Sequence, residues 1–181
     1  MKLFTFAASL RTGSWNQKLM DHTSALLREQ GATVTEVPFA DLAQMPIYNG
    51  DLQDSEGFPE AAELWKSLLE DHDGFVATIP EYNYSIPGGL KNAIDWVSRY
   101  RPQPFRGSRA FLLSASPSMV GGNRGLWASR VPFELMGVHV YPDMFSLARA
   151  NKAFDEDGSL EDKGLEQRLN GALEGFLGEF R

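Results

Sequence analysis

Three short apolar runs, in which apolar and polar residues do not alternate, constrain the fold of this sequence more than any other feature. They span residues 3–8, 75–79 and 110–115. Strands that are buried on both faces have this pattern, whereas a strand with one solvated face alternates apolar and polar residues. Segments with the apolar spacing of helices separate the runs. The sequence therefore predicts an α/β fold with a doubly wound, five-stranded parallel sheet and helices on both faces.

The remaining elements follow from weaker patterns. A β-branched, alternating segment at residues 33–37 predicts a short second strand. Residues 138–141 and 144–147 predict a fifth strand that is interrupted at Pro142. Residues 38–57, rich in Asp, Gly and Pro, predict an irregular connection with one helical turn near residues 41–43. Helices are expected after residue 16 with Gly31 as a stop, at 59–69, 90–99 and 126–136, and from the N-cap Ser159 to about Gly178.

Composition narrows the class of protein. The 181 residues show no compositional break, so we expect one domain over residues 1–181. A net charge of −7 gives no electrostatic case for binding nucleic acid or an anionic membrane. The chain has no cysteine, which excludes disulfides, thiolate metal sites and thiol catalysis and fits a reducing compartment. Because the N-terminal apolar run is too short for a signal peptide or a membrane span, we expect a cytoplasmic protein.

The loop after the first run has the residues of an anion site. Ser9, Thr12, Ser14 and Asn16 offer hydrogen-bond donors, and Arg11 adds a cation. The loop opens a helix, whose unpaired N–H groups and dipole favour an anion such as a phosphate monoester. The alternative is an ordinary set of helix-capping residues. A nucleotide triphosphatase or a common dinucleotide fold is disfavoured, because neither a Walker motif nor Gly-x-Gly-x-x-Gly is present.

Two further polar loops follow the other runs. Residues 79–92 combine Pro80, Pro87 and two glycines with Tyr82 and Tyr84, which suits a flat ligand with polar edges, or else a plain strand-to-helix connection. Residues 116–125 form a small-residue loop. Loops at the carboxyl ends of parallel strands are where open α/β sheets bind ligands. The histidines His22, His72 and His139 lack the spacing of a metal site, so no metal is expected. A serine hydrolase is disfavoured because Gly-x-Ser-x-Gly is absent.

Together these loops resemble the NADPH-dependent FMN reductase family, which includes bacterial quinone, chromate and azo-dye reductases. The resemblance is carried by Ser9-Leu10-Arg11-x-Gly13-Ser14-x-Asn16, by Pro80-Glu81-Tyr82-Asn83-x-Ser85-x-Pro87-Gly88-x-Leu90-Lys91-Asn92, and by Ser114-Ala115-Ser116-Pro117 with Gly121-Gly122-x-Arg124. It implies a flavodoxin-like fold with strand order 2-1-3-4-5. Ala8, Trp15 and Ser118 depart from the residues that many members of the family have at these positions, and none of the three removes a phosphate donor.

The resemblance also implies a role for each site residue. FMN would be the bound cofactor. Its phosphate would be held by Ser9, Arg11, Ser14 and Asn16, with Trp15 beside them. The ribityl chain and ring edge would be lined by Pro80, Glu81, Tyr82, Asn83 and Ser85. The other side of the flavin would be closed by Ser116, Gly121 and Gly122. Arg124 is either a ligand of the NADPH phosphate or a solvated arginine at a helix start.

The expected activity is hydride transfer from NADPH or NADH through FMN to a quinone or similar small-molecule acceptor, in ping-pong turnover. No catalytic side chain is expected, and backbone N–H groups near residues 81–83 and Ser116 would stabilise charge on the reduced flavin. The alternative is a flavodoxin-like electron carrier without NAD(P)H turnover of its own. The family also implies a homodimer or homotetramer. Trp96, which lies off the apolar stripe of its helix, is the hypothesised contact between subunits.

Overall fold

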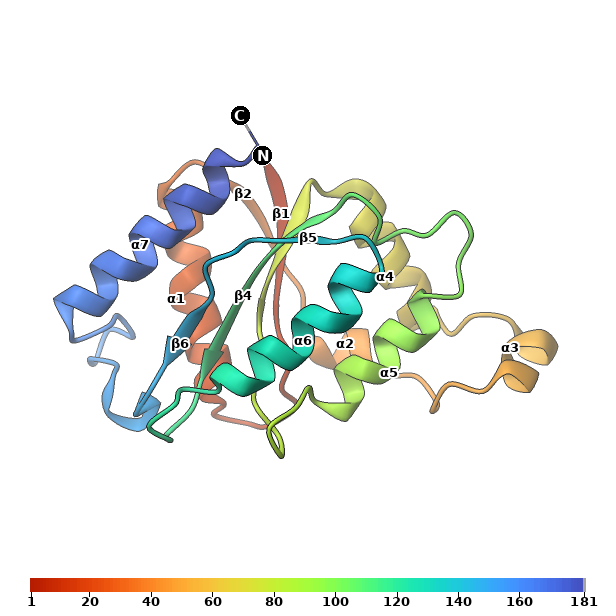
Figure 1. The fold of residues 1–181 in the computed structure, drawn as a ribbon, viewed down its shortest axis with the longest axis horizontal. Helices are drawn as coiled ribbons and strands as arrows, with labels where there is room; N and C mark the ends of the chain where they lie inside the picture. The colour runs from red at the N-terminus through yellow and green to blue at the C-terminus, as the bar shows by residue number, and fades with distance from the viewer. Residues whose placement is uncertain (181) are drawn as a thin grey trace.

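The computed structural model describes residues 1–180. Its sheet has the parallel strand order β2-β1-β3-β4-β5, and the further strand β6 pairs with β4 (Figure 1). The strands are β1 (Lys2–Ala7), β2 (Thr33–Glu36), β3 (Gly74–Thr78), β4 (Arg109–Ala115), β5 (His139–Val140) and β6 (Phe145–Leu147). The predicted parallel sheet and its strand order are confirmed. The predicted break at Pro142 is also confirmed, because β5 and β6 share the position beside β4 on either side of it.

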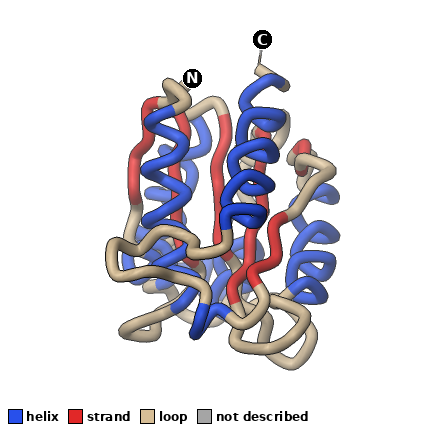
Figure 2. The backbone as a smooth tube through the Cα atoms, turned by 90° about the vertical axis from the view of Figure 1, so that its left-hand side faces the viewer, coloured by secondary structure: helices blue, strands red, loops and turns tan. Residues whose placement is uncertain are grey.

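Helices cover both faces of the sheet (Figures 1 and 2). They are α1 (Trp15–Glu29), α2 (Phe39–Ala43), α3 (Gly50–Glu56), α4 (Glu60–Asp71), α5 (Gly88–Val97), α6 (Asn123–Leu135) and α7 (Lys163–Gly178), with a 3-10 turn at Ala150–Lys152. Successive strand residues enter opposite cores. Leu3 and Val76 pack with α1 and α7, whereas Phe4 and Phe75 pack with α2, α4, α5 and α6. Burial on both faces explains why the central strands are apolar at every position.

The segment between β2 and α4 is more regular than its composition predicts. It forms α2 and α3, where the sequence predicts an irregular connection with one helical turn. The helix α3 contains no buried residue, so it has no apolar stripe for a pattern to detect. Its start is instead fixed locally, because the Asn49 side chain accepts a hydrogen bond of 2.9 Å from the backbone N–H of Asp51.

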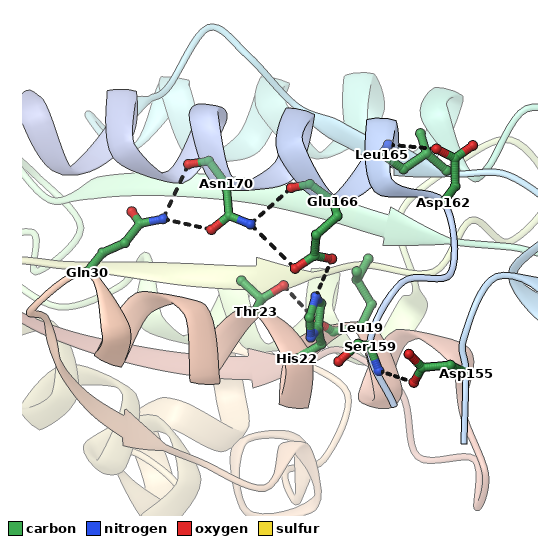
Figure 3. Close-up of polar contacts among 10 residues, drawn as sticks. All are labelled: Leu19, His22, Thr23, Gln30, Asp155, Ser159, Asp162, Leu165, Glu166 and Asn170. Atoms are coloured by element: carbon green, nitrogen blue, oxygen red, sulfur yellow. Dashed lines mark hydrogen bonds and ion pairs between the residues drawn. The ribbon is translucent and has the colours of Figure 1, made fainter. Parts of the chain in front are cut away.

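The predicted start of the last helix is wrong by three residues. Asp162, not Ser159, is the N-cap of α7, and its Oδ1 accepts hydrogen bonds from the N–H groups of Gly164 (2.8 Å) and Leu165 (3.2 Å) (Figure 3). The Ser159 N–H donates instead to the Asp155 carboxylate at 2.9 Å, within the preceding turn. Both residues are good caps, and the carboxylate that reaches two N–H groups determines the start.

A row of polar contacts joins α7 to α1 along the surface of the sheet layer (Figure 3). The His22 ring Nε2 and Glu166 Oε2 share a hydrogen bond of 2.8 Å. Asn170 Nδ2 donates to the Glu166 carbonyl at 3.0 Å, and Gln30 Nε2 donates to Asn170 Oδ1 at 3.2 Å. These bonds fix the rotation of α7 and its position along α1. Apolar residues of both helices pack between these bonds and the sheet.

Trp96 is an internal residue, which overturns the hypothesis that it is a subunit contact. Its side chain is fully buried, and its indole Nε1 donates a hydrogen bond of 2.8 Å to the Pro46 carbonyl. The ring packs edge-on against Tyr48 at a centroid distance of 5.1 Å. Trp96 departs from the helical stripe because the connection between α2 and α3 folds over this side of α5 and supplies a second buried surface.

Asn16, in the first turn of α1, ties three elements together. Its Nδ2 donates to the Ala115 carbonyl at 2.9 Å, and its Oδ1 accepts from the Ala115 N–H at 3.0 Å. Its own carbonyl accepts a bond of 2.9 Å from Thr78 Oγ1 at the end of β3. All three residues are buried. The start of α1 is thereby fixed to the carboxyl ends of β3 and β4.

No helix within residues 1–180 combines the length and the apolar character needed to cross a membrane.

We expect the substitution Trp96→Phe to destabilise the fold by about 2 kcal/mol, because the smaller ring leaves a void and the Pro46 carbonyl loses one of its two donors, keeping only Asn92 Nδ2 at 2.9 Å. Urea unfolding followed by circular dichroism measures this change in the free energy of unfolding. The matched control Tyr82→Phe, at an exposed ring, should change it by less than about 0.5 kcal/mol. The native mass should stay as in the unmodified protein, and a lower mass would restore the subunit-contact hypothesis.

We expect Asn16→Ala to cost about 2–4 kcal/mol, since both polar groups of the Ala115 backbone become buried and unpaired. Asn16→Asp is the informative companion, because a carboxylate accepts from the Ala115 N–H but opposes its carbonyl. It should be destabilising as well, although the two side chains have nearly the same size. Unchanged thermal unfolding of Asn16→Asp would show that the paired amide bonds contribute little.

Candidate functional site

The loops after β1, β3 and β4 meet at one edge of the sheet. Figure 1 shows them together below the strands, at the end opposite to the N-terminus, and Figure 2 shows the same separation from the side. Direct contacts join them. The Ala8 N–H donates to the Thr78 carbonyl at 2.8 Å, and Asn16 bonds to Ala115. The Gly125 N–H at the start of α6 donates to Glu81 Oε2 at 3.0 Å. The expected convergence of the three loops is therefore present.

The start of α1 has the features that favour anion binding. Ser14 is its N-cap, yet the hydroxyl makes no capping bond, and the first turn carries no acidic residue. Gly13 has a φ of +68°, and no atom lies within 4 Å of where its side chain would begin. Arg11 is exposed and forms no ion pair within the described chain. Unsatisfied N–H groups, the helix dipole and a nearby guanidinium together favour an anion here.

Other residues of this first loop have structural partners. The Asn16 amide is fully used by the Ala115 backbone, so it positions the loop and leaves no donor for a ligand. Ser9 Oγ accepts from the Arg11 N–H at 3.3 Å, which bends the loop. Trp15 is half-buried and stacks on Phe154 at a centroid distance of 6.4 Å. Among the predicted phosphate ligands, Ser14 and Arg11 retain their polar groups for a ligand.

The second loop ends in a tight turn. The N–H of Tyr82 donates to the Ser85 carbonyl at 3.1 Å, and the N–H of Ser85 donates back at 3.0 Å. The two central residues, Asn83 and Tyr84, have φ values of +51° and +62°, as a type I′ turn requires. Pro80 is buried beneath the turn, and both tyrosine rings are exposed. Two flat rings and an amide are thus exposed at this turn.

Glu81 joins this turn to α6 through its side chain. Besides the bond to the Gly125 N–H, Glu81 Oε1 lies 4.0 Å from Arg124 Nη1. The carboxylate acts as a capping group for a helix whose N-cap, Gly122, has no side chain. A side chain at Gly125 would approach Glu81 Cα and Cβ to 3.0 Å, so this close packing requires glycine. Arg124 in turn lies over the Tyr84 ring, with its guanidinium 4.4 Å from the centroid.

In the third loop the predicted residues face the protein. A side chain at Gly121 would collide with the backbone of Leu147 and Ala148, and one at Gly122 would collide with Ser114. Both glycines therefore permit packing against the sheet, and only their backbone remains for a ligand. The Ser116 N–H donates to the Leu147 carbonyl at 3.0 Å. This bond corrects the expectation that the Ser116 N–H is free to stabilise a negative charge, and the Tyr82 N–H is likewise used in its turn.

The sequence suggested Tyr84 only as one of two rings for a flat ligand, without its contact to Arg124, and it did not indicate Gly125. Tyr84 is exposed at the tip of the turn and carries Arg124 on its face. Gly125 makes room for Glu81. The signal for Tyr84 was present in Tyr82-Asn83-Tyr84-Ser85, because Asn readily adopts a positive φ at the first central position of a two-residue turn. No sequence signal indicated Gly125, whose role depends on a contact with a residue 44 positions away.

Within residues 1–180, we also looked for a metal site and for a cavity elsewhere on the molecule. No three His, Cys, Asp or Glu side chains in this part of the chain gather as metal ligands. A cavity of about 590 Å³ opens at the amino ends of the strands, between Met1, Asp73, Arg109 and the end of α7. Open α/β sheets bind their ligands at the carboxyl ends of the strands, so the loop cluster remains the candidate site.

Comparisons with known proteins show which family the chain resembles. Residues 1–152 match the family described as NADPH-dependent FMN reductase. The chain is 35% identical over 182 residues to a quinone reductase of Escherichia coli strain K12, covering 99% of this chain and 95% of that protein. Among solved structures, FerB, a flavoenzyme NAD(P)H:(acceptor) oxidoreductase of Paracoccus denitrificans, superimposes with a TM-score of 0.84 at 28% identity, covering 98% and 95% of the two chains.

The fold also resembles oxidised flavodoxin 1 of Bacillus cereus, with a TM-score of 0.59 at 17% identity over 98% of each chain. This similarity confirms the flavodoxin-like fold. The family match over residues 1–152 and the relatives that align along the full chain show that the chain belongs to the NADPH-dependent FMN reductase family.

Proposed function

We propose that this protein is an FMN-dependent NAD(P)H oxidoreductase that passes a hydride from NADPH or NADH through FMN to a quinone or similar small acceptor. The observation that carries the proposal is the open start of α1, where the Ser14 hydroxyl makes no capping bond and Arg11 is exposed. Membership of the FMN reductase family supports it. We further propose one domain over residues 1–181 and a cytoplasmic location, which agrees with a chain without cysteine.

The residues present fit FMN. A phosphate monoester suits the N–H groups and dipole of α1, together with the Arg11 guanidinium. A flat ring suits the neighbouring surface, where the rings of Tyr82 and Tyr84 are exposed and Asn83 adds a polar edge. We propose that Asn16, Glu81 and the two glycines of the third loop act by positioning these groups, because their polar atoms or their free space are used by the protein itself.

FMN, when bound, supplies the hydride chemistry, and the protein supplies binding and orientation. We propose that no side chain acts as a nucleophile or general base. The Glu81 carboxylate is engaged by the Gly125 N–H and lies near Arg124, which suits a structural role. Because the turn is exposed, NAD(P)H and the electron acceptor can reach the same face of the bound flavin one after the other, as ping-pong turnover requires.

Arg124 remains the candidate contact for the phosphate of NADPH. Its guanidinium stands over Tyr84 at the rim of the site, near one carboxylate and with more than half of its side chain exposed. An arginine held on an aromatic face is preorganised for a bidentate phosphate contact. The competing interpretation, that Arg124 is only a solvated arginine, does not account for its position over the Tyr84 ring.

The double substitution Arg11→Ala with Ser14→Ala should weaken FMN binding about tenfold to a hundredfold, the loss expected for one strong charge-assisted bond of about 1.5–3 kcal/mol. Retention of the visible flavin bands after gel filtration, and titration of FMN fluorescence at fixed ionic strength, measure this. The control Lys18→Ala removes the same charge from the next helical turn and should bind FMN nearly as before. Unchanged affinity in the double variant would contradict the phosphate position.

Steady-state oxidation of NADPH in the presence of a soluble quinone tests the activity. We expect turnover by the FMN-loaded protein alone, with parallel double-reciprocal plots when donor and acceptor are varied. A flavodoxin-like carrier would bind FMN but oxidise no NADPH until a separate reductase was added. A protein that never retains FMN would overturn both interpretations.

A further inference from the structure

A cavity of about 520 Å³ opens beside the connection between α5 and β4, and arginines supply all of its charged lining. Arg99, Arg101 and Arg106 contribute three guanidinium groups. The other lining residues are Ser98, Pro102, Gln103, Leu135 and Met136. The connection runs from the end of α5 back to the start of β4, so the cavity lies away from the three loops of the candidate site (Figure 1).

The sequence gives this region a charge opposite to that of the whole chain. Between Asp95 and Glu134 there are six arginines and no acidic residue, although the net charge of the chain is −7. The three arginines of the cavity are exposed, and within residues 1–180 none of them forms an ion pair. Because no carboxylate neutralises them, the cavity has a local positive potential.

Two of the arginines are held by neighbouring groups of the protein. Arg101 Nη1 donates to the carbonyls of Tyr100 at 2.7 Å and of Ser98 at 2.9 Å, as an arginine at a helix C-terminus often does. Arg99 Nε donates to Ser98 Oγ at 3.0 Å, and its guanidinium lies 5.2 Å from the centroid of the Tyr48 ring. A guanidinium has five N–H donors, so each arginine keeps further donors for a ligand.

The backbone around the cavity is also fixed. Gln103 Nε2 donates to the Ser98 carbonyl at 3.1 Å, and the Arg106 N–H donates to the Gln103 carbonyl at 3.3 Å. The Gly107 N–H donates to the Gly137 carbonyl at 2.9 Å, which ties the connection to the end of α6. Since these bonds are made without a ligand, less conformational entropy is lost when one binds.

We propose that this cavity binds a small ligand with two adjacent phosphate groups, such as inorganic pyrophosphate or a nucleoside diphosphate. Guanidinium groups pair bidentately with phosphate oxygens, and three of them match the several charges of a diphosphate. A volume of about 520 Å³ falls within the range of small-molecule sites. Leu135 and Met136 add an apolar side on which the base of a nucleotide can lie.

Two other interpretations account for less. Solvated arginines, with Arg101 serving only as a cap of α5, would explain the carbonyl bonds of Arg101. They would not explain three like charges around one cavity, which repel one another unless an anion lies between them. A long polyanion such as nucleic acid is disfavoured, because it would also meet the acidic remainder of the chain.

Isothermal titration calorimetry at fixed, low ionic strength tests the site. The protein is loaded with FMN and freed of excess, so that the start of α1 is occupied. An Arg11→Ala variant without FMN repeats the titration and makes the result independent of the proposed cofactor. We expect saturable binding of pyrophosphate and of ADP to both proteins, with dissociation constants below about 1 mM. Absence of saturable binding overturns the proposal.

Substitution of two arginines locates the bound ligand. Arg99→Gln combined with Arg106→Gln should weaken the binding of pyrophosphate at least about tenfold, because two charge-assisted contacts are lost. The matched control Arg28→Gln, at an exposed arginine of α1 that pairs with Glu36, should bind pyrophosphate as before. Equal affinity of the double variant and the unmodified protein would mean that the anion binds elsewhere, and the proposal would be wrong.

Comparison of ligands identifies the chemistry that is recognised. ADP that binds more tightly than pyrophosphate, with the difference lost in Leu135→Ser, would support a nucleotide. Equal affinities would support recognition of the diphosphate group alone. Inorganic phosphate and AMP should bind at least about tenfold more weakly, because each offers a single phosphate. If they bind as tightly as pyrophosphate and ADP, the assignment of a diphosphate site fails.

Discussion

Two hydrogen bonds between the Asn16 amide and the backbone of Ala115 hold the carboxyl edge of this sheet together. The Asn16 carbonyl adds a third bond, from Thr78, so the ends of β3 and β4 meet the start of α1 at one residue. The two amide bonds end on the Ala115 backbone, so burial of the Ala115 side chain, and not these bonds, restricts the residue type at position 115. Position 16 is restricted, because an amide side chain alone offers a donor and an acceptor side by side at this length.

Fixing α1 in this way separates the supporting residues of the site from the binding residues. Asn16, Glu81 and the glycines of the third loop are used by the protein, whereas Arg11, the first N–H groups of α1 and the two tyrosines face outward. The supporting bonds are made before any ligand arrives. A site built on such contacts loses little conformational entropy on binding, because the helix start and the turn already have their bound arrangement.

The sequence predicts those parts of the fold that depend on burial alone. Continuous apolar runs identify central strands because both faces of the sheet are covered, and polar loops after them identify the functional edge. The direction of a particular side chain depends on partners far along the chain, which a local pattern does not contain. Asn16 bonds to a residue 99 positions away, and Trp96 to one 50 positions away. The packing of Gly121 against Leu147 and of Gly122 against Ser114 follows from partners of the same distant kind, whereas α3 escaped prediction because it has no buried stripe.

The divided strand beside β4 has a consequence for the behaviour of the chain at high concentration. β5 and β6 contribute two and three residues, with Pro142 between them, and the other edge strand, β2, has only four. Neither edge offers the long, flat row of amide groups on which another chain adds a strand. Stacking of sheets into amyloid-like fibrils is thereby disfavoured while the protein is folded. A loss of solubility in the native state would come from contacts between side chains and would be reversible by dilution or added charge.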